Sequence, residues 1–115
     1  MIAAPPTIPN CVTQVAAPHH LMLACGDGNF WLDGVTWQHW GDAAATGTGT
    51  AHANDCTPNC AAGHFHTYRV TAVVGDLRTC TGGRRQYTRL LLRYPATKPA
   101  GYPNPEAIAL PCRSR

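Results

Sequence analysis

The chain has 115 residues, of which 13% are charged, and its formal net charge is +3. This length fits one folded domain, and so small a net charge lacks the strong basic bias of nucleic-acid-binding proteins. No run approaches the roughly 20 consecutive apolar residues that a membrane-spanning helix needs. We therefore expect one domain over residues 1–115 that has no membrane span and is not a nucleic-acid binder.

Prolines gather near both ends of the chain and mark two arms, residues 1–18 and 96–115, around a core at about residues 19–95. Proline fixes φ and lacks a backbone N–H, so both arms are expected to be extended surface segments. The first residues lack the basic and apolar regions of a signal peptide. Their small, proline-rich character is typical of a segment just after signal cleavage, so we expect a secreted chain whose signal peptide has been removed.

Between the arms, short runs of alternating polarity predict five strands, at about residues 20–25, 34–40, 46–53, 66–74 and 87–94. Turn-forming pairs interrupt them at Asp27-Gly28, Asp33-Gly34 and Gly82-Gly83. No window shows a convincing helical period. The predicted fold is all-β: a small disulfide-stapled β-sandwich or open barrel of about five or six antiparallel strands.

The third predicted strand alternates threonine with residues that have almost no side chain, in the run Thr-Gly-Thr-Gly-Thr-Ala from residue 46. A glycine inside a strand often marks the close approach of another group. We expect bulky rings to fill the space beside this strand, the candidates being Trp31, Trp37 and Trp40. A shallow ligand groove floored by Gly47 and Gly49 is the alternative.

The last two predicted strands have the clearest alternation, with Val70, Ala72 and Val74 on one face of the first. Leu90 and Leu92 share a face of the second. We expect the two to pair as a hairpin closed by residues 77–85.

Six cysteines in so short a chain predict three disulfides, and hence an oxidising location outside the cytosol, either extracellular or in the cell envelope. They are Cys11, Cys25, Cys56, Cys60, Cys80 and Cys112. Fifteen pairings are possible. We favour a bond between Cys11 and Cys112 that ties the two arms together, and we keep a local Cys56 to Cys60 bond as an alternative that needs a tight loop.

Residues 23–95 resemble a group of small secreted proteins of actinobacteria. The resemblance lies in the words Ala-Cys-Gly-Asp-Gly-Asn from residue 24, Trp37 to Gly41, and Asn-Asp-Cys-Thr-Pro-Asn-Cys-Ala-Ala-Gly from residue 54. It implies a shared fold and a secreted location. It implies no activity, because this group has no settled one.

Two segments contain metal-ligand residue types, but neither has a recognised spacing. Cys56, Cys60, His64 and His66 match no common zinc-finger pattern, and oxidised cysteines do not bind zinc. Asp27, Asn29 and Asp33 lack the further acidic ligand of a calcium loop, and Asp-Gly is common turn chemistry. We therefore predict no metal ion and no cofactor.

Catalytic groups are sparse. The single serine, Ser114, is the penultimate residue, and the cysteines are expected to be oxidised, so no serine or cysteine nucleophile is available. Six histidines keep a small His-dependent nuclease open, since such an enzyme needs only two imidazoles and a cation. We predict that the protein is not an enzyme.

A strip of cations and aromatic rings along the last strand is the candidate interaction surface, and it consists of Arg84, Arg85, Tyr87, Arg89 and Arg93. Such strips bind polyanions or acidic protein surfaces, although arginines also protect a sheet edge from aggregation. The predicted function is a secreted, non-enzymatic binding module in the cell envelope or an extracellular complex, with a protein or envelope partner whose identity the sequence does not indicate. The alternatives are a proteinase inhibitor presenting an extended loop at residues 54–63, and a small nuclease or metal-binding protein.

Overall fold

A computed structural model describes residues 4–112, and these form an all-β fold, as the alternating pattern predicted. The strands are β1 (Ile8–Asn10), β2 (Thr13–Val15), β3 (Leu21–Met22), β4 (Phe30–Gln38), β5 (Ala45–Asn54), β6 (Phe65–Thr79), β7 (Arg85–Arg93) and β8 (Glu106–Ala109). A short 3-10 turn, η1 (Thr81–Gly83), links β6 to β7. The described part of the chain contains no helix that could cross a membrane. Residues 1–3, where part of the predicted post-cleavage segment falls, and the end of the C-terminal arm lie outside the described residues.

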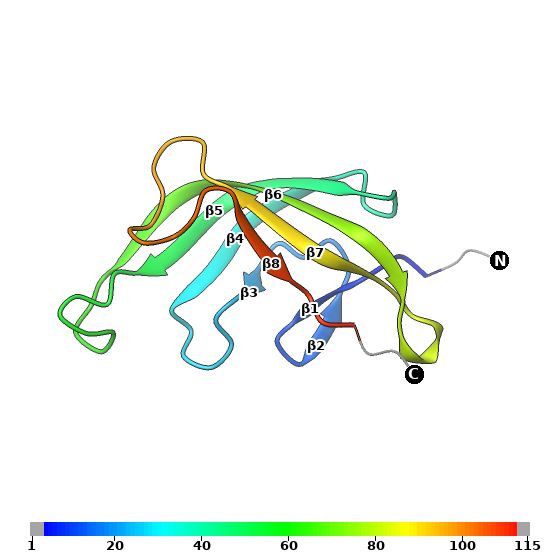
Figure 1. Ribbon diagram of the computed structural model, residues 1–115, viewed down its shortest axis with the longest axis horizontal. Coiled ribbons are helices and arrows are strands. Elements are labelled where there is room, and N and C mark those ends of the chain that lie inside the picture. Colours follow the sequence, from blue (N-terminus) through cyan, green and yellow to red (C-terminus); the bar gives the residue numbers. More distant parts are fainter. Residues whose placement is uncertain (1–3, 113–115) are drawn as a thin grey trace.

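Six strands form one antiparallel sheet in the order β3-β4-β5-β6-β7-β8, and β1 and β2 form a separate hairpin. The large sheet curls into a half-barrel, with the small hairpin below its concave side (Figure 1). All five predicted strands exist. The pattern missed β1, β2 and β8, which lie in the proline-rich arms and are at most four residues long.

The core lies inside the curl, and alternation along the strands supplies it. Val70, Ala72 and Val74 of β6 and Leu90 and Leu92 of β7 are all buried, and β6 pairs with β7 as a hairpin, which confirms the predicted faces and pairing. β6 extends to Thr79 and β7 begins at Arg85, so both strands are longer than predicted. The turn that connects them is therefore shorter than the predicted one.

Space beside the glycines of β5 is filled by β4. A Cβ on Gly47 would stand 2.8 Å from Cε3 of Trp37 and 2.8 Å from Cγ1 of Val35, and one on Gly49 would stand 2.8 Å from the carbonyl oxygen of Asp33. Trp37 therefore fills the space, as predicted, and no groove runs there. Trp31 lies on the opposite face of β4, where its ring stacks on His52 at a centroid distance of 3.8 Å.

One predicted interruption is not a turn. Asp33 and Gly34 lie inside β4, where the pairing with β5 shifts between Asp33 and Thr36 and Gly34 adopts a φ of 60°. The extra residue forms a bulge, so β4 begins at Phe30 rather than at about Gly34. Asp27-Gly28 does form a turn, in which the Asn29 backbone N–H donates to the Asp27 carboxylate at 3.0 Å.

The three disulfides are Cys11 to Cys25, Cys56 to Cys60 and Cys80 to Cys112. The favoured bond between Cys11 and Cys112 is wrong. Cys11 instead fixes the β1–β2 hairpin to the loop after β3, and Cys112 fixes the C-terminal arm to the end of β6. The predicted local bond between Cys56 and Cys60 is confirmed, and the described residues include no free cysteine.

Candidate functional site

Two surfaces carry side chains whose chemistry suits binding. The first is the outer face of β6 and β7, where part of the predicted arginine strip lies. The second is a cleft at the end of the half-barrel where β6 begins.

The predicted strip of five residues does not exist as one surface. Arg89 and Arg93 are exposed on the outer face of β7. Arg84 and Arg85 are only partly exposed near the hairpin turn, where Arg84 Nη2 donates to Gln86 Oε1 at 3.3 Å and Arg85 Nη2 donates to the Ala4 carbonyl oxygen at 3.1 Å.

Tyr87 must be removed from the interaction surface, because its side chain is fully buried. Its ring packs against Trp40, and its hydroxyl donates to the Asp42 carbonyl oxygen at 2.6 Å and accepts from the Gly41 N–H at 2.8 Å. Strict alternation would place Tyr87 beside Arg89. The left-handed backbone of Asp76, with a φ of 54°, interrupts that alternation, and beyond it Leu77 and its cross-strand partner Tyr87 pack on the core.

Arg69 of β6 joins Arg89 and Arg93 on the outer face, and the sequence reasoning missed it because it lies on another strand. It is two residues from Thr71, which pairs with Arg93. Between the arginines lies the cross-strand pair Val73 and Leu91, both partly exposed. We call these five residues, Arg69, Val73, Arg89, Leu91 and Arg93, the arginine face.

A shallow depression of about 220 Å³ lies within the arginine face, lined by Val73, Gly75, Arg89 and Leu91. Gly75 leaves it open, since a Cβ there would meet no atom within 4 Å. Within residues 4–112, none of the three arginines forms an ion pair with a carboxylate. The face therefore presents apolar surface beside positive charge, of which Arg89 alone lies near a carboxylate, that of Asp76.

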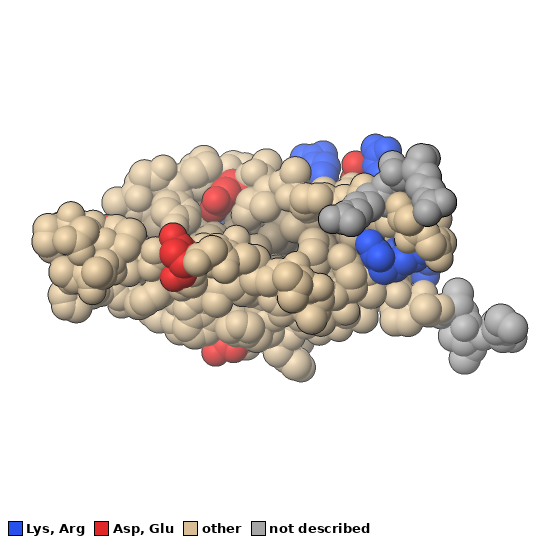
Figure 2. All heavy atoms as spheres, turned by 90° about the horizontal axis from the view of Figure 1, so that it is seen from below, with Lys and Arg blue, Asp and Glu red and all other residues tan. Residues whose placement is uncertain are grey.

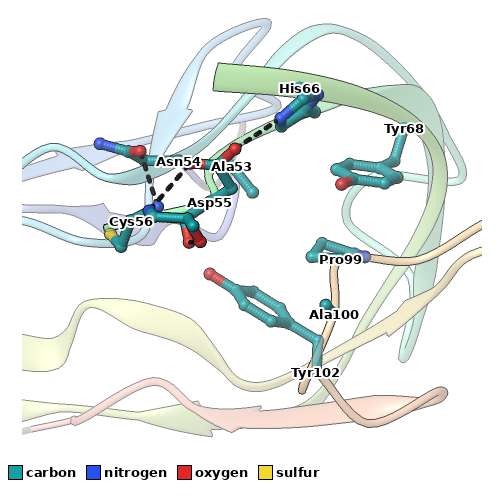
Figure 3. Close-up of a pocket in the computed structure, with 10 residues that line it drawn as sticks. Ala53, Asn54, Asp55, Cys56, His66, Tyr68, Pro99, Ala100 and Tyr102 are labelled. Carbon is teal, nitrogen blue, oxygen red and sulfur yellow. Dashed lines mark hydrogen bonds and ion pairs between the residues drawn. The ribbon is translucent and has the colours of Figure 1, made fainter. Parts of the chain in front are cut away.

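The cleft lies between the start of β6, the loop after β5 and the loop that follows β7, and its volume is about 420 Å³. Asp55, His66, Tyr68, Pro99 and Tyr102 surround it, with the Tyr102 hydroxyl pointing toward the Asp55 side (Figure 3). A volume of this size is typical of small-ligand pockets.

Hydrogen bonds hold Asp55 in place at the edge of the cleft. Its Oδ1 accepts from the backbone N–H groups of His64 at 3.0 Å and Thr57 at 3.1 Å, and its Oδ2 lies 2.9 Å from Nε2 of His66. These bonds, the one from His64 first, lower the pKa of Asp55 from its ordinary value of 3.8 to about 2. The carboxylate is therefore ionised throughout the physiological pH range.

The loop that carries Asp55 is compact rather than extended. Asn54 donates through Nδ2 to the Cys60 carbonyl oxygen at 2.8 Å and accepts through Oδ1 from the Cys56 N–H at 2.9 Å. A side chain at Gly63 would collide with Asn54 Oδ1. The loop at residues 54–63 is exposed, as predicted, but the Cys56 to Cys60 bond folds it into a ring, so it is not the extended loop expected of an inhibitor.

Both tyrosine rings of the cleft are supported from behind by other aromatic rings. Tyr68 packs edge-on against Tyr94 at 6.5 Å, and Tyr102 packs edge-on against Phe30 at 5.1 Å. The loop carrying Tyr102 is closed by Asn104, which donates through Nδ2 to the Tyr94 carbonyl oxygen and accepts from the Tyr94 N–H. The positions of the rings are therefore fixed before any ligand arrives.

The electrostatic environment near the cleft is negative. Burial, followed by the charges of Glu106 and Asp27, raises the pKa of the Tyr102 hydroxyl. Burial also raises the pKa of Glu106, against the hydrogen bond from Tyr94. On the face shown in Figure 2, Lys and Arg side chains gather toward the end where β6 turns into β7, and most Asp and Glu side chains lie nearer the other end.

The remaining histidines are not assembled into one site. His52 and His20 both contact the ring of Trp31, and His19 Nδ1 lies 2.9 Å from the Val35 carbonyl oxygen. Cys56 and Cys60 are bonded to each other, so they cannot supply thiolate ligands, and the described chain has no group of three metal-ligating side chains. Asp27 and Asp33 lie in a turn and a bulge.

Comparisons with family models, with curated proteins and with solved structures found no match to this chain.

Proposed function

We propose that the protein is a secreted, non-enzymatic binding module that contacts an acidic segment of a partner protein through the arginine face. Three disulfides stabilise its fold, which suits an oxidising extracellular space or cell envelope. The residues lining the cleft include one imidazole, that of His66. A His-dependent nuclease would need a second imidazole beside it.

The arrangement of the arginine face carries this proposal. Its three arginines, which form no ion pair with any carboxylate of residues 4–112, surround the apolar pair Val73 and Leu91 and the depression beside Gly75. Protein interfaces combine an apolar centre with a polar rim, and arginine is enriched in them. An apolar side chain of the partner would occupy the depression, and its flanking carboxylates would face the arginines.

A defined peptide probe tests the proposal. We would measure fluorescence anisotropy of a labelled peptide of alternating Glu and Leu, with a Gln and Leu peptide as the neutral control. The wild type should bind the acidic probe, and the affinity should fall as salt rises, because exposed charges are screened within about 8 Å at physiological ionic strength.

Matched variants locate the binding. Arg93→Glu should weaken binding by about two- to fivefold, the range for one exposed charge pair, whereas Lys98→Glu makes the same change of charge at an exposed residue of the loop that follows β7, outside the arginine face, and should have little effect. Gly75→Leu fills the depression and should also weaken binding. Equal losses for Arg93→Glu and Lys98→Glu, or equal binding of both probes, would contradict the proposal.

A further inference from the structure

We propose that the cleft binds a methylated ammonium group, as in choline or a trimethylated amine, between the rings of Tyr68 and Tyr102 and the carboxylate of Asp55. This site is independent of the arginine face. It lies on the other face of the sheet from Arg69, because Tyr68 and Arg69 are successive residues of β6 and point to opposite sides.

Aromatic rings are the first component of the proposed site. The negative face of a tyrosine ring attracts a cation, and cages of such rings are the usual means of holding quaternary ammonium ligands. Tyr68 is half-buried and Tyr102 is partly exposed at the cleft, and the rings behind them hold both in position. Pro99 adds apolar surface between the two rings (Figure 3).

The second component is the carboxylate of Asp55, which carries negative charge but has few lone pairs free to accept further hydrogen bonds. Both lone-pair positions of Asp55 Oδ1 are used by the His64 and Thr57 N–H groups, and Oδ2 is engaged by His66. A primary ammonium or a guanidinium group would need acceptors for its several N–H donors, and this carboxylate has little capacity left. A methylated ammonium has no such donors and needs only the electric field and apolar contact.

The size and charge of the cleft agree with this ligand. Its volume of about 420 Å³ exceeds what a trimethylammonium headgroup needs, which leaves room for the rest of a small ligand. The carboxylates of Asp27 and Glu106 act on Tyr102 and add to the negative potential. No Lys or Arg is among the residues that line the cleft, and the one basic side chain there is His66, which contacts Asp55.

Titration with a pair of isosteric probes tests the assignment. Choline and 3,3-dimethyl-1-butanol have the same shape and differ in the central atom, which is a charged nitrogen in choline and a neutral carbon in the alcohol. We would add each to the isotopically labelled protein, up to tens of millimolar, and follow backbone amide resonances. Choline should shift those of the cleft residues, such as His66 and Tyr102, and the alcohol should bind about fivefold or more weakly.

Substitutions of Tyr102 distinguish the contribution of its aromatic ring to binding from that of its hydroxyl group. Tyr102→Phe keeps the aromatic face and should retain choline binding, whereas Tyr102→Leu removes the face and should weaken binding by about fivefold or more. Should Tyr102→Leu fail to fold, Tyr68→Phe and Tyr68→Leu give the same comparison from the opposite wall.

The inference would be overturned by equal binding of choline and the alcohol, by no response to choline, or by shifts confined to residues outside the cleft. N-acetylglucosamine is the third probe, because tyrosine rings also stack on sugars. A stronger response to this sugar than to choline would assign the cleft to carbohydrate instead. None of these results depends on the arginine face.

Discussion

Replacing Gly47 by alanine tests the packing at the centre of the half-barrel. The added Cβ would lie 2.8 Å from both Trp37 Cε3 and Val35 Cγ1, which is shorter than real Cβ contacts. Val35 is buried, and the partly buried ring of Trp37 is held by a hydrogen bond from its Nε1 to the Pro18 carbonyl oxygen at 2.8 Å, so the methyl group and the ring have little room to move. Overpacking of this kind costs about 1–3 kcal/mol.

Gly75→Ala is the matched control, because it adds the same methyl group to the neighbouring strand where no atom lies within 4 Å. Alanine restricts the unfolded chain more than glycine does, so this variant should be neutral or slightly more stable, by about 0.4–1 kcal/mol. Thermal unfolding of the oxidised protein measures both. At about 4 °C per kcal/mol for a domain near this size, Gly47→Ala should melt roughly 4–12 °C below the wild type.

Equal melting temperatures for Gly47→Ala and Gly75→Ala would refute the reasoning. That result would mean that Trp37 does not lie against β5, and with it the explanation for the glycines of this strand would fail. Gly49→Ala is a second test of the same packing and should also lower the melting temperature, because the added Cβ would meet the backbone oxygen of Asp33, which cannot rotate away.

Three further changes have distinct expected outcomes. Replacing Cys80 and Cys112 by serine opens a 32-residue loop and should cost about 3–4 kcal/mol, against about 2 kcal/mol for the 4-residue loop of Cys56 and Cys60; chemical denaturation compares them, and equal losses would count against the loop-entropy account. Tyr87→Phe removes two hydrogen bonds from a buried ring and should cost about 1–3 kcal/mol, which an unchanged denaturation midpoint would disprove. The low pKa of Asp55 stabilises the folded state above pH 3.8, and this contribution is lost as the pH falls toward about 2; the wild type should lose its advantage over Asp55→Asn in that interval, and parallel stability curves would argue against it.

Much of the sheet could be predicted from the sequence because each long strand has one buried face. Residues of β6 from Tyr68 to Val74 alternate without interruption, and this local pattern is sufficient to define the strand and its inward side. The small residues of β5 also indicated correctly that a bulky ring must lie beside them. Short strands such as β8 have no such pattern, since four residues between prolines resemble a loop.

What the sequence could not predict depends on the path of the backbone. Tyr87 is two residues from Arg89, so alternation predicts the same surface for both, but the alternation breaks beside the left-handed residue Asp76 of the neighbouring strand and Tyr87 faces the core. The cleft likewise brings Tyr68 of β6 to Tyr102, which lies 34 positions along the chain in the C-terminal arm. The proline-rich sequence predicts an extended surface segment for this arm. The hydrogen bonds of Asn104 to the Tyr94 backbone bring the arm back to the sheet and place Tyr102 at the cleft.

β6 runs the length of the molecule, and its two ends have different surroundings. Fifteen residues from Phe65 to Thr79 extend roughly 50 Å at about 3.3 Å per residue, which is close to the longest dimension of 52 Å. The cleft lies at its first residues, whereas Ala4 and Cys112 are held near its last residues by Arg85 and Cys80. A resin, a fluorophore or another domain attached near Ala4 or Cys112 would therefore lie at the opposite end of β6 from the cleft. The protein can thus be immobilised for ligand screening with the cleft left accessible.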